Sequence, residues 1–80
     1  MDRKAMSDRE FEQSCRNFRD GTTYQEYLEE IERLLGIFDW HYTPKQAREL
    51  ITLNEEFISG EYKKKESSYD TAIEVGFVGG

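Results

Sequence analysis

The strongest structural signal in the chain is TTYQEYLEEIERLLG, residues 22–36. Apolar side chains recur there at helical spacing: Tyr24, Tyr27, Leu28, Ile31, Leu34 and Leu35. The opposite side carries Glu26, Glu29, Glu30 and Arg33. A pattern with this period predicts an amphipathic helix that buries one face and exposes the acidic one. Either threonine can cap its start and Gly36 marks its end, and Leu28, Ile31 and Leu35 are expected to anchor the core.

A further helix is predicted on each side of this one. Residues 7–10, SDRE, match a capping box, in which serine and glutamate satisfy backbone N–H groups, and Gly21 supplies the stop. Residues 43–46, TPKQ, repeat the arrangement, with Pro44 at the first helical position. This third helix is predicted to run to Gly60, and an extension as far as Glu66 stays open. Its buried face is expected to comprise Ala47, Leu50, Ile51, Asn54, Phe57 and Ile58.

The C-terminal residues follow a different pattern. Ile73, Val75 and Phe77 alternate with smaller or polar residues, a period of two that favours a strand, but no second strand is evident. Three arrangements stay open: an extended segment across the helices, strand pairing outside the chain, or a short helix capped by Asp70. The sequence therefore predicts a mainly α fold, a small three-helix domain with an extended or β C-terminal segment. Residues 1–80 are expected to form one domain, with 1–6 and 79–80 flexible.

The chain is acidic, with a formal net charge of −6 from 17 acidic and 11 basic residues. The excess is concentrated in residues 20–61, where ten acids stand against three bases. A field of this sign repels phosphate backbones and anionic lipids, and it attracts basic protein surfaces. No signal peptide or membrane-spanning run is visible, and a single cysteine fits a reducing compartment, so we expect a cytoplasmic location.

Catalytic and metal-binding chemistry finds little support in the sequence. Cys15 lies between Phe11 and Phe18 on the apolar stripe of the first helix, a position typical of a structural cysteine. His41 stands between two aromatic residues and is expected to be a packed loop side chain. A Cys/His metal site would have at most two ligands, and no EF-hand spacing is present. We therefore expect a protein that is not an enzyme, with no cofactor and no bound metal.

Aromatic residues are more numerous than so small a core needs. Five Phe, five Tyr and one Trp occur in 80 residues, and Trp40 is the one most expected to serve the core. Tyr and Trp are favoured at interfaces because an apolar ring is joined to a polar tip. Together with the acidic field, they predict a partner-binding surface formed by Tyr24, Glu26, Glu29, Glu30, Asp39, Trp40, Tyr42, Glu55 and Glu56.

These features predict an inhibitor or adaptor that occludes a basic, nucleic-acid-binding surface of a larger protein by mimicking nucleic acid. Small phage-encoded inhibitors such as anti-CRISPR proteins act in this general way, a parallel of size and charge alone. Direct contact with nucleic acid or with membrane is not expected. The alternative is a small helix-turn-helix-like transcriptional regulator or antitoxin, with Lys45 and Arg48 facing DNA. A homodimer, or an oligomer joined through the C-terminal strand, is a further alternative.

Overall fold

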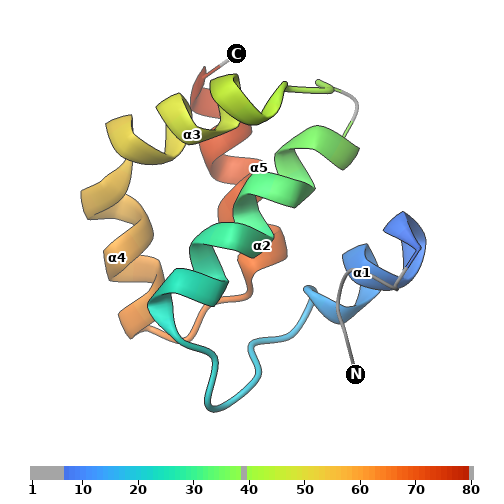
Figure 1. Ribbon diagram of the computed structural model, residues 1–80. Coiled ribbons are helices and arrows are strands. Elements are labelled where there is room, and N and C mark those ends of the chain that lie inside the picture. Colours follow the sequence, from blue (N-terminus) through green and yellow to red (C-terminus); the bar gives the residue numbers. More distant parts are fainter. Residues whose placement is uncertain (1–6, 39, 80) are drawn as a thin grey trace.

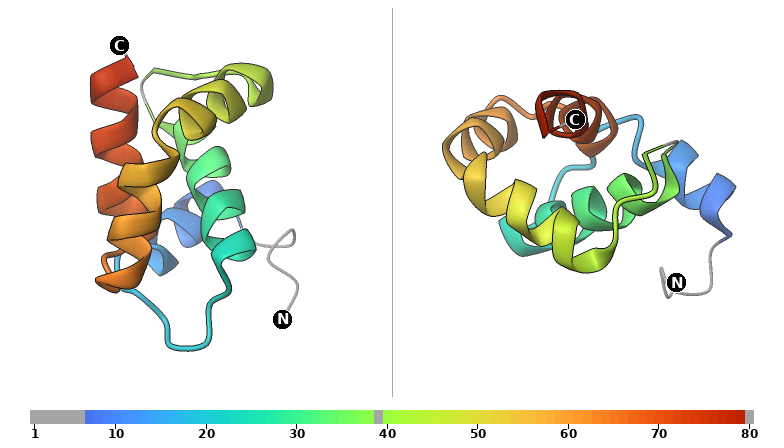
Figure 2. Two further views of the ribbon diagram at one scale, coloured as in Figure 1. Left: turned by 90° about the vertical axis from the view of Figure 1, so that its left-hand side faces the viewer. Right: turned by 90° about the horizontal axis from the view of Figure 1, so that it is seen from above.

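The computed structural model of the protein describes residues 7–38 and 40–79. Five helices and no strand occur in this part of the chain: α1 (Asp8–Ser14), α2 (Tyr24–Ile37), α3 (Pro44–Leu53), α4 (Glu55–Lys63) and α5 (Ser68–Gly79). Helices α2 and α5 pack side by side, α3 crosses one end of this pair, and α4 and α1 lie on opposite sides of it (Figure 1). The molecule is flat, with principal extents of 31 × 26 × 16 Å (Figure 2). The prediction of a mainly α fold is confirmed.

Side-chain caps begin the first three helices where the sequence predicts them. The Ser7 hydroxyl accepts from the backbone N–H of Glu10 at the start of α1. Thr23 forms a complete capping box with Glu26, and Thr43 forms one with Gln46. These bonds satisfy N–H groups that have no partner inside the helix, which fixes where each helix starts.

The core is built around the apolar face of α2. Tyr27, Ile31, Leu34 and Leu35 are at most 1% exposed, whereas Leu28 is only half-buried. The other helices, together with the C-cap residue of α1, supply the rest of the buried apolar side chains: Phe11, Cys15, Ala47, Ile58, Ala72 and Val75. The Tyr27 hydroxyl lies 2.7 Å from the Thr71 hydroxyl, so the centre of α2 is joined to α5 by a buried polar contact.

The C-terminal segment is a helix, which corrects the prediction of an extended or β segment. Ser67 caps α5, because its hydroxyl accepts from the backbone N–H of Asp70 at 3.1 Å. Two helical stripes share this segment. A buried stripe contains Ala72, Val75 and Gly76, and an exposed stripe contains Ile73 and Phe77. Because both stripes contain apolar residues, apolar side chains occur at every second position from Ile73 to Phe77, which is the pattern expected of a strand.

The predicted third helix is divided in two. Asn54 departs from helical geometry, with φ −112° and ψ 22°, and separates α3 from α4. The bend turns Ile58 into the core but leaves Phe57 41% exposed, contrary to the prediction that Phe57 is buried. Gly60 lies inside α4 and does not end it. Gly21 adopts the left-handed conformation, with φ 91°, but α1 already ends at Ser14, so the prediction that Gly21 stops the first helix is wrong.

The ends of the described chain bear on two further expectations. Residues 1–6 and Gly80, expected to be flexible, lie outside the described residues, and Gly79 is the last residue of α5. Within the described ranges, no helix is both long enough and apolar enough to cross a bilayer.

Candidate protein-binding surface

The fold separates the residues predicted to bind a partner into two groups. Tyr24, Glu26 and Glu29 belong to the first half of α2, and Glu55 and Glu56 open α4. Trp40 and Tyr42 follow the other end of α2 and contact Gly76 of α5. Asp39 lies outside the described residues. The sequence-based surface is therefore not one continuous patch.

Glu30 is a structural residue, which corrects its assignment to the exposed acidic face. It is 3% exposed and pairs with the guanidinium of Arg19. The Ser68 hydroxyl donates to its other oxygen at 2.7 Å. Arg19 also donates to the backbone carbonyl of Ser14 at 2.7 Å. This cluster ties the α1–α2 connection to the start of α5, so Glu30 is not available to a partner.

The first group gathers where the start of α2 meets α4. The ring of Tyr24 packs edge-on against that of Tyr62, with centroids 5.3 Å apart. Its hydroxyl oxygen is buried without a hydrogen-bond partner, and burial together with the nearby charge of Glu55 raises the pKa of Tyr24. Glu26 is held by the α2 cap, whereas Glu55 and Glu56 are exposed. Leu53, two residues before Glu55, is 81% exposed, and Phe57, directly after Glu56, is 41% exposed.

The second group lies against α5. The Tyr42 hydroxyl donates to the backbone carbonyl of Gly76 at 3.2 Å. The Trp40 indole lies on the same glycine so closely that a Cβ atom there would come within 2.3 Å of a ring carbon. Trp40 also packs edge-on against Phe38, with centroids 5.8 Å apart. It is nevertheless 38% exposed, so the expectation that Trp40 belongs to the core is wrong.

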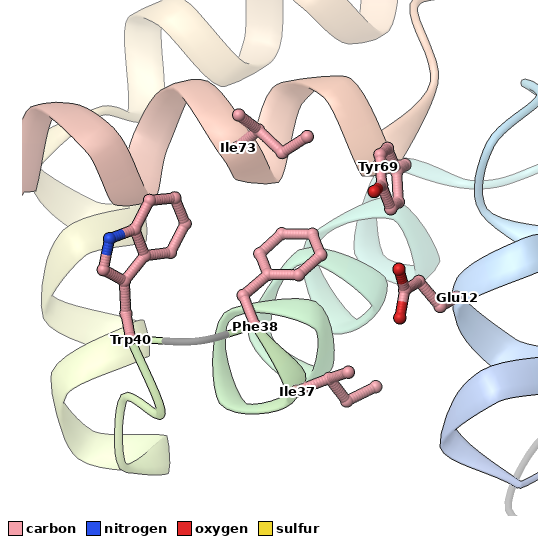
Figure 3. A pocket seen from close by; sticks show the side chains of 6 residues that line it. All are labelled: Glu12, Ile37, Phe38, Trp40, Tyr69 and Ile73. Atoms are coloured by element: carbon pink, nitrogen blue, oxygen red, sulfur yellow. The ribbon is translucent and has the colours of Figure 1, made fainter.

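A groove opens beside the Trp40 side chain and holds about 410 Å³. It runs between α5 and the end of α2, and α1 closes one end (Figure 3). Five of the six residues that line it are aliphatic or aromatic, and the sixth is Glu12: Glu12, Ile37, Phe38, Trp40, Tyr69 and Ile73. Sequence reasoning did not find this groove, because it depends on the helical form of α5.

One side of α5 continues the groove toward the C-terminus. Tyr69, Ile73 and Phe77 recur every four residues and lie on one side of the helix. Ile73 is 36% and Phe77 76% exposed, and the carboxylates of Asp70 and Glu74 are exposed beside them. We call these four exposed side chains, from Asp70 to Phe77, the α5 face. The four-residue spacing is present in the sequence, but the alternation of Ile73, Val75 and Phe77 coincides with it, so the spacing alone does not distinguish this helix from a strand.

Charge compensation is uneven over the described residues. Six ion pairs occupy most of the basic side chains: Arg16, Arg19, Arg33, Arg48, Lys64 and Lys65. Among the residues that the structure describes, only Arg9, Lys45 and Lys63 are basic and outside these pairs. The exposed carboxylates outside them are more numerous: Glu10, Glu29, Glu49, Glu55, Glu56, Glu66, Asp70 and Glu74. The carboxylates at the start of α4 and those along α5 therefore have no counter-charge in an ion pair among the described residues.

Three residues were considered from the sequence for catalysis, metal binding or DNA contact: Cys15, His41 and Arg48. Cys15 is 1% exposed, and burial raises the pKa of its thiol, which disfavours the reactive thiolate. His41 is exposed on a loop with φ 48°, so the expectation of a packed side chain is wrong. Arg48, proposed for DNA contact, lies 3.6 Å from a carboxylate oxygen of Glu32. No group of three potential metal ligands occurs among the described residues.

Comparisons with known proteins identify no relative. No family model, no curated protein and no solved structure matches the chain.

Proposed function

We propose that the protein is a non-enzymatic inhibitor or adaptor that binds a basic surface of a larger protein and covers it. The observation that carries this proposal is the position of the exposed apolar side chains. Leu53 and Phe57 flank Glu55 and Glu56, and Ile73 and Phe77 alternate with Asp70 and Glu74. None of these four carboxylates has an ion pair within the described part of the chain.

This combination suits association with a basic protein. Carboxylates without counter-charges attract Lys and Arg over a distance and so speed the first encounter. Apolar and aromatic side chains that become buried then hold the complex, because contacts of this kind dominate the free energy of binding. A surface used only for solubility needs the carboxylates but gains nothing from exposed Leu53 and Phe77.

An acidic face binds basic protein surfaces, and this preference leads to the proposal that the protein occludes a nucleic-acid site. Basic protein surfaces commonly bind the phosphates of nucleic acid, and a row of carboxylates presents the same sign of charge. A flat molecule, 31 × 26 × 16 Å, covers a wide area for its mass. The protein has two acidic faces: the α5 face, and an α4 face formed by Leu53, Glu55, Glu56 and Phe57. Bound through either of them, it would exclude nucleic acid from the site beneath it.

The test begins with a partner captured by the tagged protein from its native lysate. Displacement of labelled nucleic acid from that partner is then followed by fluorescence anisotropy. We expect the parent to displace the nucleic acid, and we expect a variant with Glu55→Lys, Glu56→Lys, Asp70→Lys and Glu74→Lys to fail.

A control with half that change of charge carries Glu10→Lys and Glu66→Lys, two exposed carboxylates away from the Glu55/Glu56 and Asp70/Glu74 pairs and likewise without an ion pair among the described residues. We expect this control to displace the nucleic acid almost as well as the parent does. If the parent leaves nucleic acid bound at saturating concentration, the occlusion mechanism is wrong. If nucleic acid binds directly to this protein, the regulator alternative replaces it.

A further inference from the structure

We infer that the α5 face and the adjoining groove bind a basic amphipathic helix presented by the partner. This inference rests on the proposed function and makes it specific, because it names which of the two acidic faces docks and what it docks. The spacing of the apolar side chains, the charges around them and the support of Trp40 favour this occupant.

The apolar side chains of the site have the spacing of a helix-binding surface. Tyr69, Ile73 and Phe77 follow one another at four-residue intervals, roughly 6 Å apart along the axis of α5. A second helix laid beside α5 presents side chains at the same intervals, so its ridges can enter the spaces between them. The groove of about 410 Å³ next to Ile73 gives an apolar side chain of that helix a place to enter.

The charges around the site select a basic helix. Helix α5 contains no Lys or Arg, and its exposed charged residues are Asp70 and Glu74. At the α1 end of the groove, Glu12 and Arg16 form an ion pair of 3.8 Å, and the Arg16 guanidinium lies over the Tyr69 ring at 4.5 Å, so this pair adds no net charge there. The carboxyl end of a helix is itself partly negative, which extends the field toward Phe77.

The same charges disfavour a second copy of the chain as the occupant. In a two-fold symmetric dimer the same patch faces itself, so Asp70 and Glu74 of one copy would oppose those of the other. No basic side chain on α5 could relieve this repulsion. Like charges brought together at an interface oppose association, so a homodimer through this face is not expected.

The groove is shaped by one tight contact. Gly76 has no side chain, which lets the Trp40 indole lie directly on α5 and form one wall of the groove. Trp40 is the only tryptophan of the chain, so its fluorescence reports on this site alone. A helix that enters the groove will cover the exposed part of the indole and shift its emission to shorter wavelength.

Three synthetic peptides of about 18 residues, a length that permits helix formation in water, provide the test. The first has Leu at i, i+4 and i+7 with Lys at the flanking positions, the second has Glu in place of Lys, and the third has Ala in place of Leu. None contains Trp, so the emission of Trp40 is followed as each is added to the full-length protein. We expect the first peptide to bind with a shift of the emission, and the other two to bind at least roughly ten-fold more weakly.

Variants locate the binding. Asp70→Lys with Glu74→Lys should weaken the first peptide roughly ten-fold, whereas Glu55→Lys with Glu56→Lys, the same change of charge on the other face, should leave its affinity within about two-fold. Phe77→Ala should weaken it without altering the salt dependence. Equal binding of the Lys and Glu peptides, or loss of binding on the α4 substitutions alone, would overturn the inference. The absence of any shift in the Trp40 emission would also overturn it. A third contrary result would be a protein that sediments as a dimer and whose dimer becomes more stable on Asp70→Lys with Glu74→Lys.

Failure here and failure of the proposed function can be told apart. One outcome is that the parent displaces nucleic acid from the captured partner while only Glu55→Lys with Glu56→Lys prevents the displacement. In that case the protein occludes a basic surface, but through the start of α4 and not through the α5 face. If the basic peptide binds the α5 face while nucleic acid stays on the partner, the docking site is correct and the occlusion is not.

Discussion

Replacing Gly76 by alanine tests the contact that shapes the groove. An added Cβ would lie 2.3 Å, 2.6 Å and 3.0 Å from three carbon atoms of the Trp40 indole. Carbon atoms in contact are ordinarily about 3.5–4.0 Å apart, so the ring has to retreat by more than about 1 Å. The same substitution at Gly60, inside α4, meets no atom within 4 Å and provides a matched control.

The two substitutions should change the free energy of unfolding in opposite directions. Alanine is favoured over glycine within a helix by about 1 kcal/mol, and Gly60→Ala should gain about this much. At Gly76 the same gain is opposed by overpacking, which costs about 1–3 kcal/mol. Since the ring of Trp40 is 38% exposed and can move outward, we expect a net loss of about 1 kcal/mol. The two variants should therefore differ by about 2 kcal/mol.

Urea unfolding followed by circular dichroism measures this difference. With a slope of about 1 kcal/mol per molar urea for a chain of this size, the two midpoints should lie about 2 M apart. The emission of Trp40 should shift to longer wavelength in Gly76→Ala and stay unchanged in Gly60→Ala. Equal stabilisation by both substitutions, with the parent's emission retained in both, would refute the placement of Trp40 on α5.

Three further predictions concern the core. Ile31→Ala should lower the free energy of unfolding by about 2–5 kcal/mol, and Leu28→Ala, at a half-buried position, by about 1–2 kcal/mol; a melting temperature within about a degree of the parent for Ile31→Ala would refute its place in the core. Glu30→Ala should cost about 2–3 kcal/mol because it leaves the buried Ser68 hydroxyl without its acceptor, whereas Glu29→Ala on the exposed side should stay within about 0.5 kcal/mol in the same urea titration. Burial raises the pKa of Tyr27 from 10.0 to about 12. The unfolded chain therefore loses the phenol proton at a lower pH than the folded protein does. The free energy of unfolding that this group contributes is fully present below pH 10 and should fall by up to about 3 kcal/mol as the pH rises to 12. Tyr27→Phe should flatten that alkaline decline, and an unchanged decline would mean that other groups cause it.

The sequence was most informative where side chains bond to nearby backbone. The caps at Ser7, Thr23 and Thr43 involve residues only three positions apart, so a local pattern contains the whole interaction. The buried face of α2 was also predictable, because its period of 3.6 residues extends over four turns. Leu28 shows the limit of this reasoning, since the neighbouring helices decide how far each side of the face is covered.

The last third of the chain was less predictable because its outcome depends on tertiary packing. Helix α5 is apolar on both its buried and its exposed sides, and no periodicity of hydrophobic residues can identify a helix of that kind. Asn54 interrupts the third predicted helix, and its side-chain amide donates a hydrogen bond of 2.8 Å to the carbonyl of Leu50. The sequence around Asn54 contains no Gly or Pro that would have predicted this interruption.

The candidate site was predicted in composition but not in geometry. The sequence indicated that acidic and aromatic residues form the surface, and it named Trp40, Tyr42, Glu55 and Glu56. It could not show that Glu30 turns inward to Arg19, since position 30 borders the apolar face of α2 and burial there depends on a partner 11 residues away. Nor could it identify Ile73 and Phe77, whose exposure follows from the way that α5 packs on α2.

The salt dependence of the association rate tests the central claim most directly. With the captured partner immobilised, the rate constants for association and dissociation are measured from about 0.1 M to 1 M salt, over which the Debye length falls from about 10 Å to about 3 Å. If uncompensated carboxylates attract a basic partner, association should slow steeply while dissociation changes little, and Asp70→Lys with Glu74→Lys should slow association at low salt. Association that is equally fast at both salt concentrations and in the charge-reversed variant would contradict the claim, and the acidic surface would then serve solubility alone.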